Sequence, residues 1–370
     1  MRAEPPSLPG VLSSAESLAT ALSIEAMQEP SGAIPWTPGE HTDVWNHVEG
    51  AMALLVAGRV AAAERAYAWA LSLQRPDGSW PLKIVRGTVE DTSGDPNATA
   101  YVAVGIWQHW LIRRDLEFVR RCWPAVRRGL DFVVGMQLPF GGVAWSQEWT
   151  AQGPGRVNEE ALLAGSSSIY QSLRAGVALA ELLGQPQPEW ELAGGRLGHA
   201  VREHRDLFLD KSTFSMDWYY PVLGGAVRGA AGRRLIESRW DDFVVPGLGI
   251  RCVDTNPWVT GAETCELAMA LHALGDHARA RRLMADTQHL RTEDGRYWTG
   301  LVFPENVNWP VEHTTYTAAA MLLAADALSR GSAASAIMLG EGLAPHFPEI
   351  GLECGCPSGD RFSGVSAHSS

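Results

Sequence analysis

The chain has 370 residues, a formal net charge of -12 at pH 7 and 46% hydrophobic residues. This acidic balance argues against nucleic acid or an anionic membrane as a partner, because both require a basic face. The first residues lack a secretory apolar segment, and no apolar run is long enough to span a bilayer. We therefore expect a cytoplasmic protein.

Four segments along the chain combine a glutamine, a glycine and a tryptophan after a helical stretch. A glycine in each segment permits a tight reversal of the chain. The recurrence therefore predicts a repeated helical hairpin closed by a tryptophan-bearing turn. In chain order the anchors are Gln28, Gly32 and Trp36; Gln74, Gly78 and Trp80; Gln137, Gly142 and Trp145; and Gln288, Gly295 and Trp298.

Apolar residues recur with helical spacing between these turns, whereas strand-like alternation is scarce. Gly58, Gly184 and Gly275 stand where helices of a hairpin are expected to stop. Roughly six hairpins would close a ring, so the predicted fold is an all-α (α/α)6 toroid with its long loops on one face. The predicted helical stretches cover residues 45–74, 98–113, 118–137, 168–184, 263–288 and 314–329.

No linker divides the chain, so residues 1–335 are predicted to form one barrel domain. Residues 336–370 are expected to be a flexible C-terminal tail. Cys354 and Cys356 lie in that tail and have no second ligand pair, which favours a tail over a metal clip. Cys122, Cys252 and Cys265 fit reduced core thiols.

The chain contains 15 tryptophans, many of them in the long loops. Sugars combine apolar faces with hydroxyl groups, so their sites pair aromatic platforms with polar side chains. For the turn tryptophans, packing on helix ends is an equally good interpretation. The predicted substrate-binding residues are Trp36, His41, Trp45, Asn46, Trp80, Asp91, Asp95, Tyr101, Trp145, Tyr170, Asp217, Trp218, Tyr219, Arg251, Trp258, Trp298 and Glu312.

Glycoside hydrolysis needs two carboxyl groups that flank the scissile bond. Asp43 and Glu263 each stand at a predicted helix start beside tryptophans, and both also suit a structural role there. Thr260 is the better candidate for capping the second helix, which leaves Glu263 for chemistry. Asp91 and Asp217 remain alternatives for the acid.

Other chemistries have less support. The sequence contains no phosphate-binding glycine loop, no HExxH and no paired CxxC motif. We therefore expect no cofactor and no metal.

The Gln/Gly/Trp turns resemble the repeats of squalene cyclases and protein prenyltransferases. A class II cyclase of that kind uses a DxDD motif, which this sequence lacks. A protein prenyltransferase binds zinc through Asp, Cys and His, and no histidine follows Asp254 and Cys265 at the expected place. Because of the resemblance between the turns, an enzyme acting on an isoprenoid is the alternative prediction, although these catalytic motifs are missing.

A second resemblance covers residues 15–330. The stretches GAIPWTPGEHTDVWNHVEGAMAL, SMDWYYPVLGGAVRG, PWVTGAETCELAMAL and WPVEHTTYTAAAMLLAADAL are similar to endomannanases that act on α-1,4-linked methylmannose polysaccharide. That resemblance implies an endo-acting, inverting glycosidase of a polysaccharide inside the cell. In the wider class of (α/α) glycosidases an Asp acts as acid and a later Glu as base, which Asp43 and Glu263 match. A noncatalytic glycan-binding protein is the third possibility.

Overall fold

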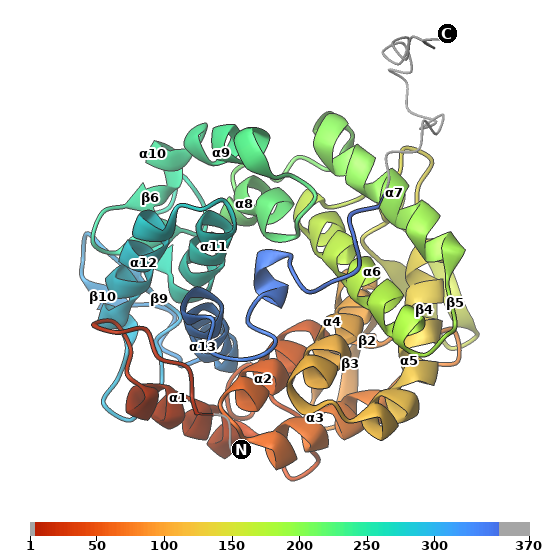
Figure 1. Cartoon of the computed structure of the whole chain (residues 1–370), viewed down its shortest axis with the longest axis horizontal. Helices are drawn as coiled ribbons and strands as arrows, with labels where there is room; N and C mark the ends of the chain where they lie inside the picture. Colours follow the sequence, from red (N-terminus) through yellow and green to blue (C-terminus); the bar gives the residue numbers. More distant parts are fainter. Residues whose placement is uncertain (1–3, 348–370) are drawn as a thin grey trace, which may run out of the picture.

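The computed structural model describes residues 4–347. Six inner helices form a ring in which each helix packs against the next, and α13 closes the ring against α2 (Figure 1). This confirms the predicted all-α (α/α)6 toroid. The inner helices are α2 (Val44–Val56), α4 (Pro96–Arg113), α6 (Leu163–Leu182), α8 (Ser215–Leu223), α11 (Gly261–Ala273) and α13 (Thr315–Ser329).

Six outer helices surround this ring. Each packs against the inner helix that precedes it in the chain, except α1, which packs against α13 and α2 where the ring closes. Short connections lead from an inner helix to the outer helix that follows it, and longer loops return to the next inner helix, so all inner helices point the same way. The outer helices are α1 (Ser14–Met27), α3 (Val60–Ser72), α5 (Leu116–Gly135), α7 (Pro188–Glu203), α9 (Gly229–Glu237) and α12 (His277–Asp286). A short α10 (Trp240–Phe243) and the 3-10 turns η1 (Arg205–Leu207) and η2 (Thr287–Leu290) complete the outer layer.

The two layers differ in how they are buried. The inner helices are apolar nearly all round, as expected for helices surrounded by protein. Ala318, Ala319 and Ala320 of α13 are all 0% exposed, and their small side chains let neighbouring helices approach closely. Helix α5 instead buries one stripe, including Phe118 and Val126, and turns its arginines outward.

The glutamines of the repeated turns hold the outer layer together. The Nε2 amide of Gln74 donates to the carbonyl of Gly78 at 2.9 Å and to that of Ala125 in the next outer helix at 2.8 Å. Gln28 and Gln137 make the same two bonds at their own turns. Each such glutamine therefore clamps a turn onto the following outer helix.

Two details of the predicted repeat are wrong. In the third turn Gln137 bonds to Gly141, and not to the predicted anchor Gly142. Gln288 of η2 donates to the Met284 carbonyl of α12 and accepts from the Tyr297 hydroxyl at 3.2 Å, so its amide makes neither of the two clamp bonds. The last repeat therefore keeps its glycine and tryptophan but lacks the glutamine clamp.

The turn glycines are required by both backbone angle and space. Gly78 has φ +96°, and a Cβ there would collide with the carbonyl of Arg128. The equivalent Gly141 has φ +100°, and its Cβ would lie 2.7 Å from the carbonyl oxygen of Arg196. These turns therefore dock backbone against backbone on the neighbouring helix.

We predict that Gly78→Ala lowers the free energy of unfolding by about 3 kcal/mol, through backbone strain and the collision with helix α5. Gly87→Ala is the matched control, because Gly87 has φ +80° but nothing within 4 Å of an added Cβ. The control should cost about 1 kcal/mol, from strain alone. Denaturant unfolding measures both, and equal losses would contradict the docking argument.

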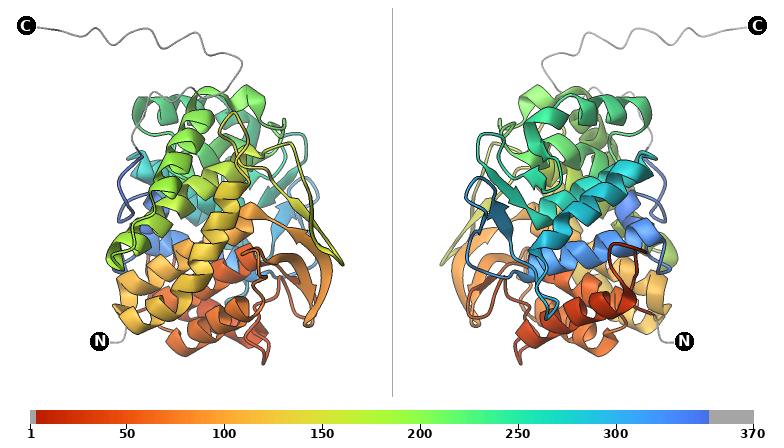
Figure 2. Two further views of the ribbon diagram at one scale, coloured as in Figure 1. Left: turned by 90° about the vertical axis from the view of Figure 1, so that its right-hand side faces the viewer. Right: turned by 90° about the vertical axis from the view of Figure 1, so that its left-hand side faces the viewer.

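The long loops fold into two antiparallel sheets that the sequence analysis did not predict. They lie at the end of the barrel where the inner helices begin (Figure 2). One sheet runs in the order β1 (His41–Thr42), β2 (Pro81–Val85), β3 (Thr88–Gly94), β4 (Gln147–Thr150) and β5 (Gly153–Val157). The other runs β10 (Val307–Asn308), β9 (Gly300–Val302), β8 (Trp258–Thr260), β7 (Gly249–Arg251) and β6 (Val244–Val245).

The C-terminal segment covers the opposite end of the ring (Figure 2). It contains the 3-10 turn η3 (Ile337–Leu339), which packs against α11 and α13. The segment stays packed to Phe347, which is 7% exposed, so the predicted domain boundary at residue 335 lies too early. Cys354 and Cys356 fall outside the described residues. Within residues 4–347, no helix is long and apolar enough to cross a membrane.

Candidate active site

The inner helices all begin at the end of the barrel that carries the two sheets, and this end is called the mouth below. Strands β1 and β8 lead directly into α2 and α11, which places the first residues of both helices at the mouth. Helix N-termini present unpaired N–H groups and a partial positive charge. Their convergence suits carboxylates and sugar hydroxyls.

Asp43 is the N-cap of α2. Its Oδ1 accepts a hydrogen bond from the backbone N–H of Asn46 at 2.9 Å, and its Oδ2 accepts one from the Asn46 side chain at 2.6 Å. Asp43 therefore does cap the helix, as the structural interpretation of this residue predicted. The carboxylate still reaches solvent, with 15% of the side chain exposed, and His41 Nε2 lies 3.9 Å from its Oδ2.

Glu263 lies in the first turn of α11 and is 8% exposed. Thr260 occupies the N-cap position as expected, but its hydroxyl makes no capping bond. Burial and then the charge of nearby Glu263 raise the pKa of the Cys252 thiol. The Glu263 carboxylate is therefore almost enclosed at the start of α11.

Helix α13 packs between α2 and α11 in the ring and carries Tyr316 in its first turn. The Tyr316 ring packs against Trp36 and Trp45, with centroids 5.7 and 5.5 Å apart. Burial and nearby acidic groups, Glu263 among them, raise the pKa of Tyr316. These three rings are called the aromatic floor below.

Trp36 and Trp45, two of these rings, make further contacts. Trp45 stacks on Tyr101 at 5.0 Å, and its buried Nε1 has no partner among residues 4–347. Trp36 stacks on His41 at 5.9 Å and donates through Nε1 to Glu312 at 2.9 Å. Glu312 therefore orients Trp36.

Two further predicted aspartates lie at inner-helix starts. Asp95 caps α4 through Ala98, and burial with the charge of Asp43 raises its pKa to about 6. Asp217 accepts from the N–H of Ala164 at 3.2 Å, and burial raises its pKa to about 6. A raised pKa is what a general acid needs, so both are rivals to Asp43 for that role.

Trp258 and Trp309 form an aromatic edge on the second sheet, with ring centroids 5.0 Å apart. Trp258 Nε1 donates to the Trp309 carbonyl at 2.7 Å, and Trp309 is 52% exposed. Exposed tryptophan at a rim suits the apolar face of a sugar.

Several other predicted binding residues lie away from the mouth or serve the framework. Trp80 and Trp218 are 1% and 3% exposed, and their Nε1 atoms donate to backbone carbonyls. Tyr170 is 1% exposed and contacts His346 at the covered end. Tyr101 and Tyr219 are as enclosed, at 2% and 0% exposed. Burial of this degree leaves no surface for a ligand, so all five are corrected to core residues.

The remaining predicted residues occupy the loops and sheets. The Asp91 carboxylate accepts a hydrogen bond from the backbone N–H of Ser93, and Arg251 donates to the Asp254 carbonyl at 2.8 Å. Trp145 is half-buried, and Trp298 packs on His313 at 3.9 Å. None of these contacts assigns a role in binding.

A buried carboxyl network beneath the mouth was missed by the sequence analysis. Glu266 accepts hydrogen bonds from Tyr219, from Tyr220 at 2.7 Å and from Tyr316 at 3.1 Å. Glu49 of α2 accepts from Tyr101 at 2.6 Å. The signal available in the sequence was a glutamate inside each of two otherwise apolar helices.

Burial raises the pKa of Glu49 to about 7 and that of Glu266 to about 8, and the charge of Glu49 adds to the second shift. Tyr219, Tyr220 and Tyr316 are all buried, and Tyr316 also packs against Trp36 and Trp45 of the aromatic floor. The network therefore ties the aromatic floor to two carboxyl groups in the middle of the barrel.

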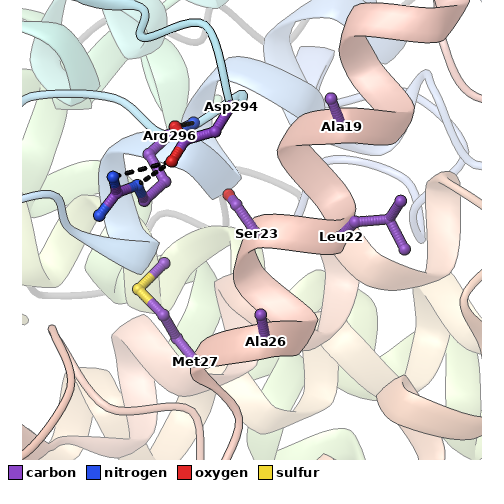
Figure 3. Close-up of a pocket in the computed structure, with 7 residues that line it drawn as sticks. All are labelled: Ala19, Leu22, Ser23, Ala26, Met27, Asp294 and Arg296. Atoms are coloured by element: carbon purple, nitrogen blue, oxygen red, sulfur yellow. Dashed lines mark hydrogen bonds and ion pairs between the residues drawn. The ribbon is translucent and has the colours of Figure 1, made fainter.

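A separate groove lies on the outer wall between α1 and the turn at Asp294 (Figure 3). It has a volume of about 490 Å3 and is lined mainly by small and apolar side chains of α1. Its carboxylate, Asp294, pairs with Arg296 at 2.8 Å. It therefore offers no pair of facing carboxylates.

Sequence comparison identifies a relative over almost the whole chain, although no protein-family profile matches. The MMP endo-(1,4)-3-O-methyl-α-D-mannosidase of Mycolicibacterium hassiacum is 54% identical over 356 residues, which cover 96% of this chain and 98% of the relative. The chain belongs to this family of glycoside hydrolases. Membership favours the glycosidase prediction over the isoprenoid alternative.

Solved structures share the fold of this glycoside hydrolase. A wild-type glycosidase has a TM-score of 0.66 at 16% identity and covers 86% of this chain and 98% of its own. D-mannose isomerase has 0.64 at 11%, over 86% and 98% of the two chains. A GH63 mannosylglycerate hydrolase from Thermus thermophilus, in complex with glucose, has 0.58 at 14%, over 84% and 99%. These identities establish the fold alone.

We predict that Glu49 and Glu266 contribute stability to the glycoside hydrolase that is lost as pH rises from about 4.5 to about 8, because the folded state keeps their protons after the unfolded chain has lost them. Glu266→Gln removes one such group and should flatten the slope by up to about 1.4 kcal/mol per pH unit. Denaturant unfolding across that window measures it. The exposed Glu117→Gln should leave the slope unchanged, and parallel profiles for wild type and Glu266→Gln would refute the argument.

Proposed function

We propose that this glycoside hydrolase cleaves internal α-1,4 linkages of a 3-O-methylated mannan. The observation that carries the proposal is the 54% identity to an endo-methylmannosidase over almost the whole chain. It is supported by the aromatic floor, in which Trp45 follows Asp43 closely in the chain and Tyr316 lies within reach of the charge of Glu263. A methylated sugar is more apolar than a free one, which suits the aromatic walls. Trp36 and Trp45 would contact the sugar nearest the cleavage point.

In the proposed reaction Asp43 donates its proton to the glycosidic oxygen as the C–O bond breaks. Glu263 takes a proton from a water molecule, whose oxygen bonds to the anomeric carbon from the opposite face. The products are two sugar chains, and the configuration at the new reducing end is inverted. This course requires the two carboxyl groups to lie about 6.5 to 9.5 Å apart.

The proposal places the protein in the cytoplasm. Cys122, Cys252 and Cys265 are free thiols, and Cys122 and Cys265 are buried. Free thiols are typical of a reducing compartment. We also propose that the polysaccharide substrate is the partner of the mouth, and that residues 4–347 fold as one domain.

We predict that Asp43→Asn and Glu263→Gln each lower kcat by at least about 100-fold, because each removes a proton-transfer group. Asparagine caps helices as well as aspartate, so Asp43→Asn should keep its Tm. Asp91→Asn, on β3 of the sheet that leads into α2, is the matched control and should retain activity. Turnover of methylated mannan, read by mass spectrometry, measures all three.

The same assay separates the rival acids. Asp95→Asn and Asp217→Asn should retain more activity than Asp43→Asn if Asp43 is the acid. If Asp43→Asn is active while the folded Asp95 or Asp217 variant is inactive, that other aspartate is the general acid and the assignment to Asp43 is wrong.

Stereochemistry gives an independent prediction. Proton NMR during cleavage of an α-1,4-methylmannan oligosaccharide should show the β-anomer first, followed by slow mutarotation. Initial release of the α-anomer would indicate retention and a carboxyl spacing of about 5 Å. Release of single sugars from one end would contradict the endo action.

A further inference from the structure

Two arginines, one buried and one half-buried, hold the C-terminal segment over the end of the barrel opposite the mouth. Arg174 of α6 is 3% exposed, and its Nε donates to the carbonyl of Ala344 at 2.8 Å. Arg228, which precedes α9, donates through Nη2 to the carbonyl of Leu339 at 3.0 Å. Each guanidinium group thus uses one nitrogen to fix the segment.

The two guanidinium groups lie close together. A Cβ built on Gly225 would lie 3.2 Å from Arg228 Nη2 and 3.4 Å from Arg174 Nη1. A Cβ on Gly340 would overlap the same Nη2 and lie 3.7 Å from the same Nη1. The positive φ angles of these glycines, +91° and +72°, shape the backbone around the pair. The space beside both arginines is therefore narrow.

The pair has no carboxylate partner in the part of the chain that the structure describes. The Nη1 atoms of Arg174 and Arg228 are both buried and donate to no hydrogen-bond acceptor there. Glu341, the acidic group that raises the pKa of Arg228, is itself paired with Arg330 at 2.9 Å. Two like charges held close together, with their Nη1 atoms buried, are unfavourable unless a counter-charge lies beside them.

The positive charge of the pair acts on the groups around it. Burial and then the charges of Arg174, Arg228 and Arg202 lower the pKa of His346 to about 4. Burial, followed by the charge of Arg174, lowers the pKa of Arg228 to about 10. A water molecule would satisfy an N–H group but would leave this charge uncompensated.

We propose that a small monovalent anion of the chloride class binds between the guanidinium groups of Arg174 and Arg228, whose Nη1 atoms have no other acceptor among residues 4–347, and fastens the C-terminal segment to the barrel. Two N–H donors and a narrow, positively charged space favour a compact anion over a phosphate or a sugar acid. Met338, next to Leu339 in the segment, contacts Tyr101 at 3.9 Å. The anion therefore stabilises the layer on which the central carboxyl network rests.

Bromide is the direct probe, because it replaces chloride and scatters anomalously. Crystals of the wild-type protein soaked in sodium bromide should give an anomalous peak within about 3.5 Å of both Nη1 atoms. A peak absent from that position, with only a water there, overturns the proposal. This experiment needs no variant.

Thermal unfolding tests the same site in solution. The Tm of the wild type should rise by about 2 °C or more from sodium gluconate to sodium chloride at equal ionic strength, and the rise should saturate with chloride. Arg174→Met and Arg228→Met should lose this difference, whereas the exposed control Arg156→Met should keep it. An equal difference in all variants, or a bromide peak without any chloride effect on the wild type, overturns the proposal.

Discussion

The rest of the structure depends on six inner helices pointing the same way around a closed ring. This arrangement brings six helix N-termini to one end, where their N–H groups need polar partners. Asp43 and Asp95 meet that need as caps, and Glu263 stands in the first turn of its helix. The ring therefore places acidic side chains at the mouth before any substrate is considered.

Outer-layer clamps keep the ring in register. Gln28, Gln74 and Gln137 each bridge a turn and the next outer helix, and the turn glycines let backbones touch. Beneath the mouth, Glu49 and Glu266 anchor tyrosines from three other inner helices, α4, α8 and α13. Raised pKa values of these two carboxyl groups reflect the burial needed to hold the aromatic floor. Framework and site are thus parts of one hydrogen-bonded system.

Much of this arrangement could be predicted from the sequence, because the Gln/Gly/Trp turns and apolar spacing are local signals. The places of Asp43 and Glu263 at helix starts followed from the same patterns. The two sheets could not be predicted, because strands of two to seven residues carry little alternation and pair across distant loops. Glu266 was missed because its partners come from other helices, and Trp80 and Trp218 were misassigned because composition does not show which face a side chain takes.

The most direct test of the account is a crystal structure of the Asp43→Asn variant with a methylmannan oligosaccharide bound across the mouth. The account predicts that the scissile oxygen lies within hydrogen-bond reach of the substituted side chain at position 43. It also predicts a water between Glu263 and the anomeric carbon, with the two side-chain carbonyl carbons about 6.5 to 9.5 Å apart. A scissile bond seated against Asp95 or Asp217, or a spacing of about 5 Å, would contradict it.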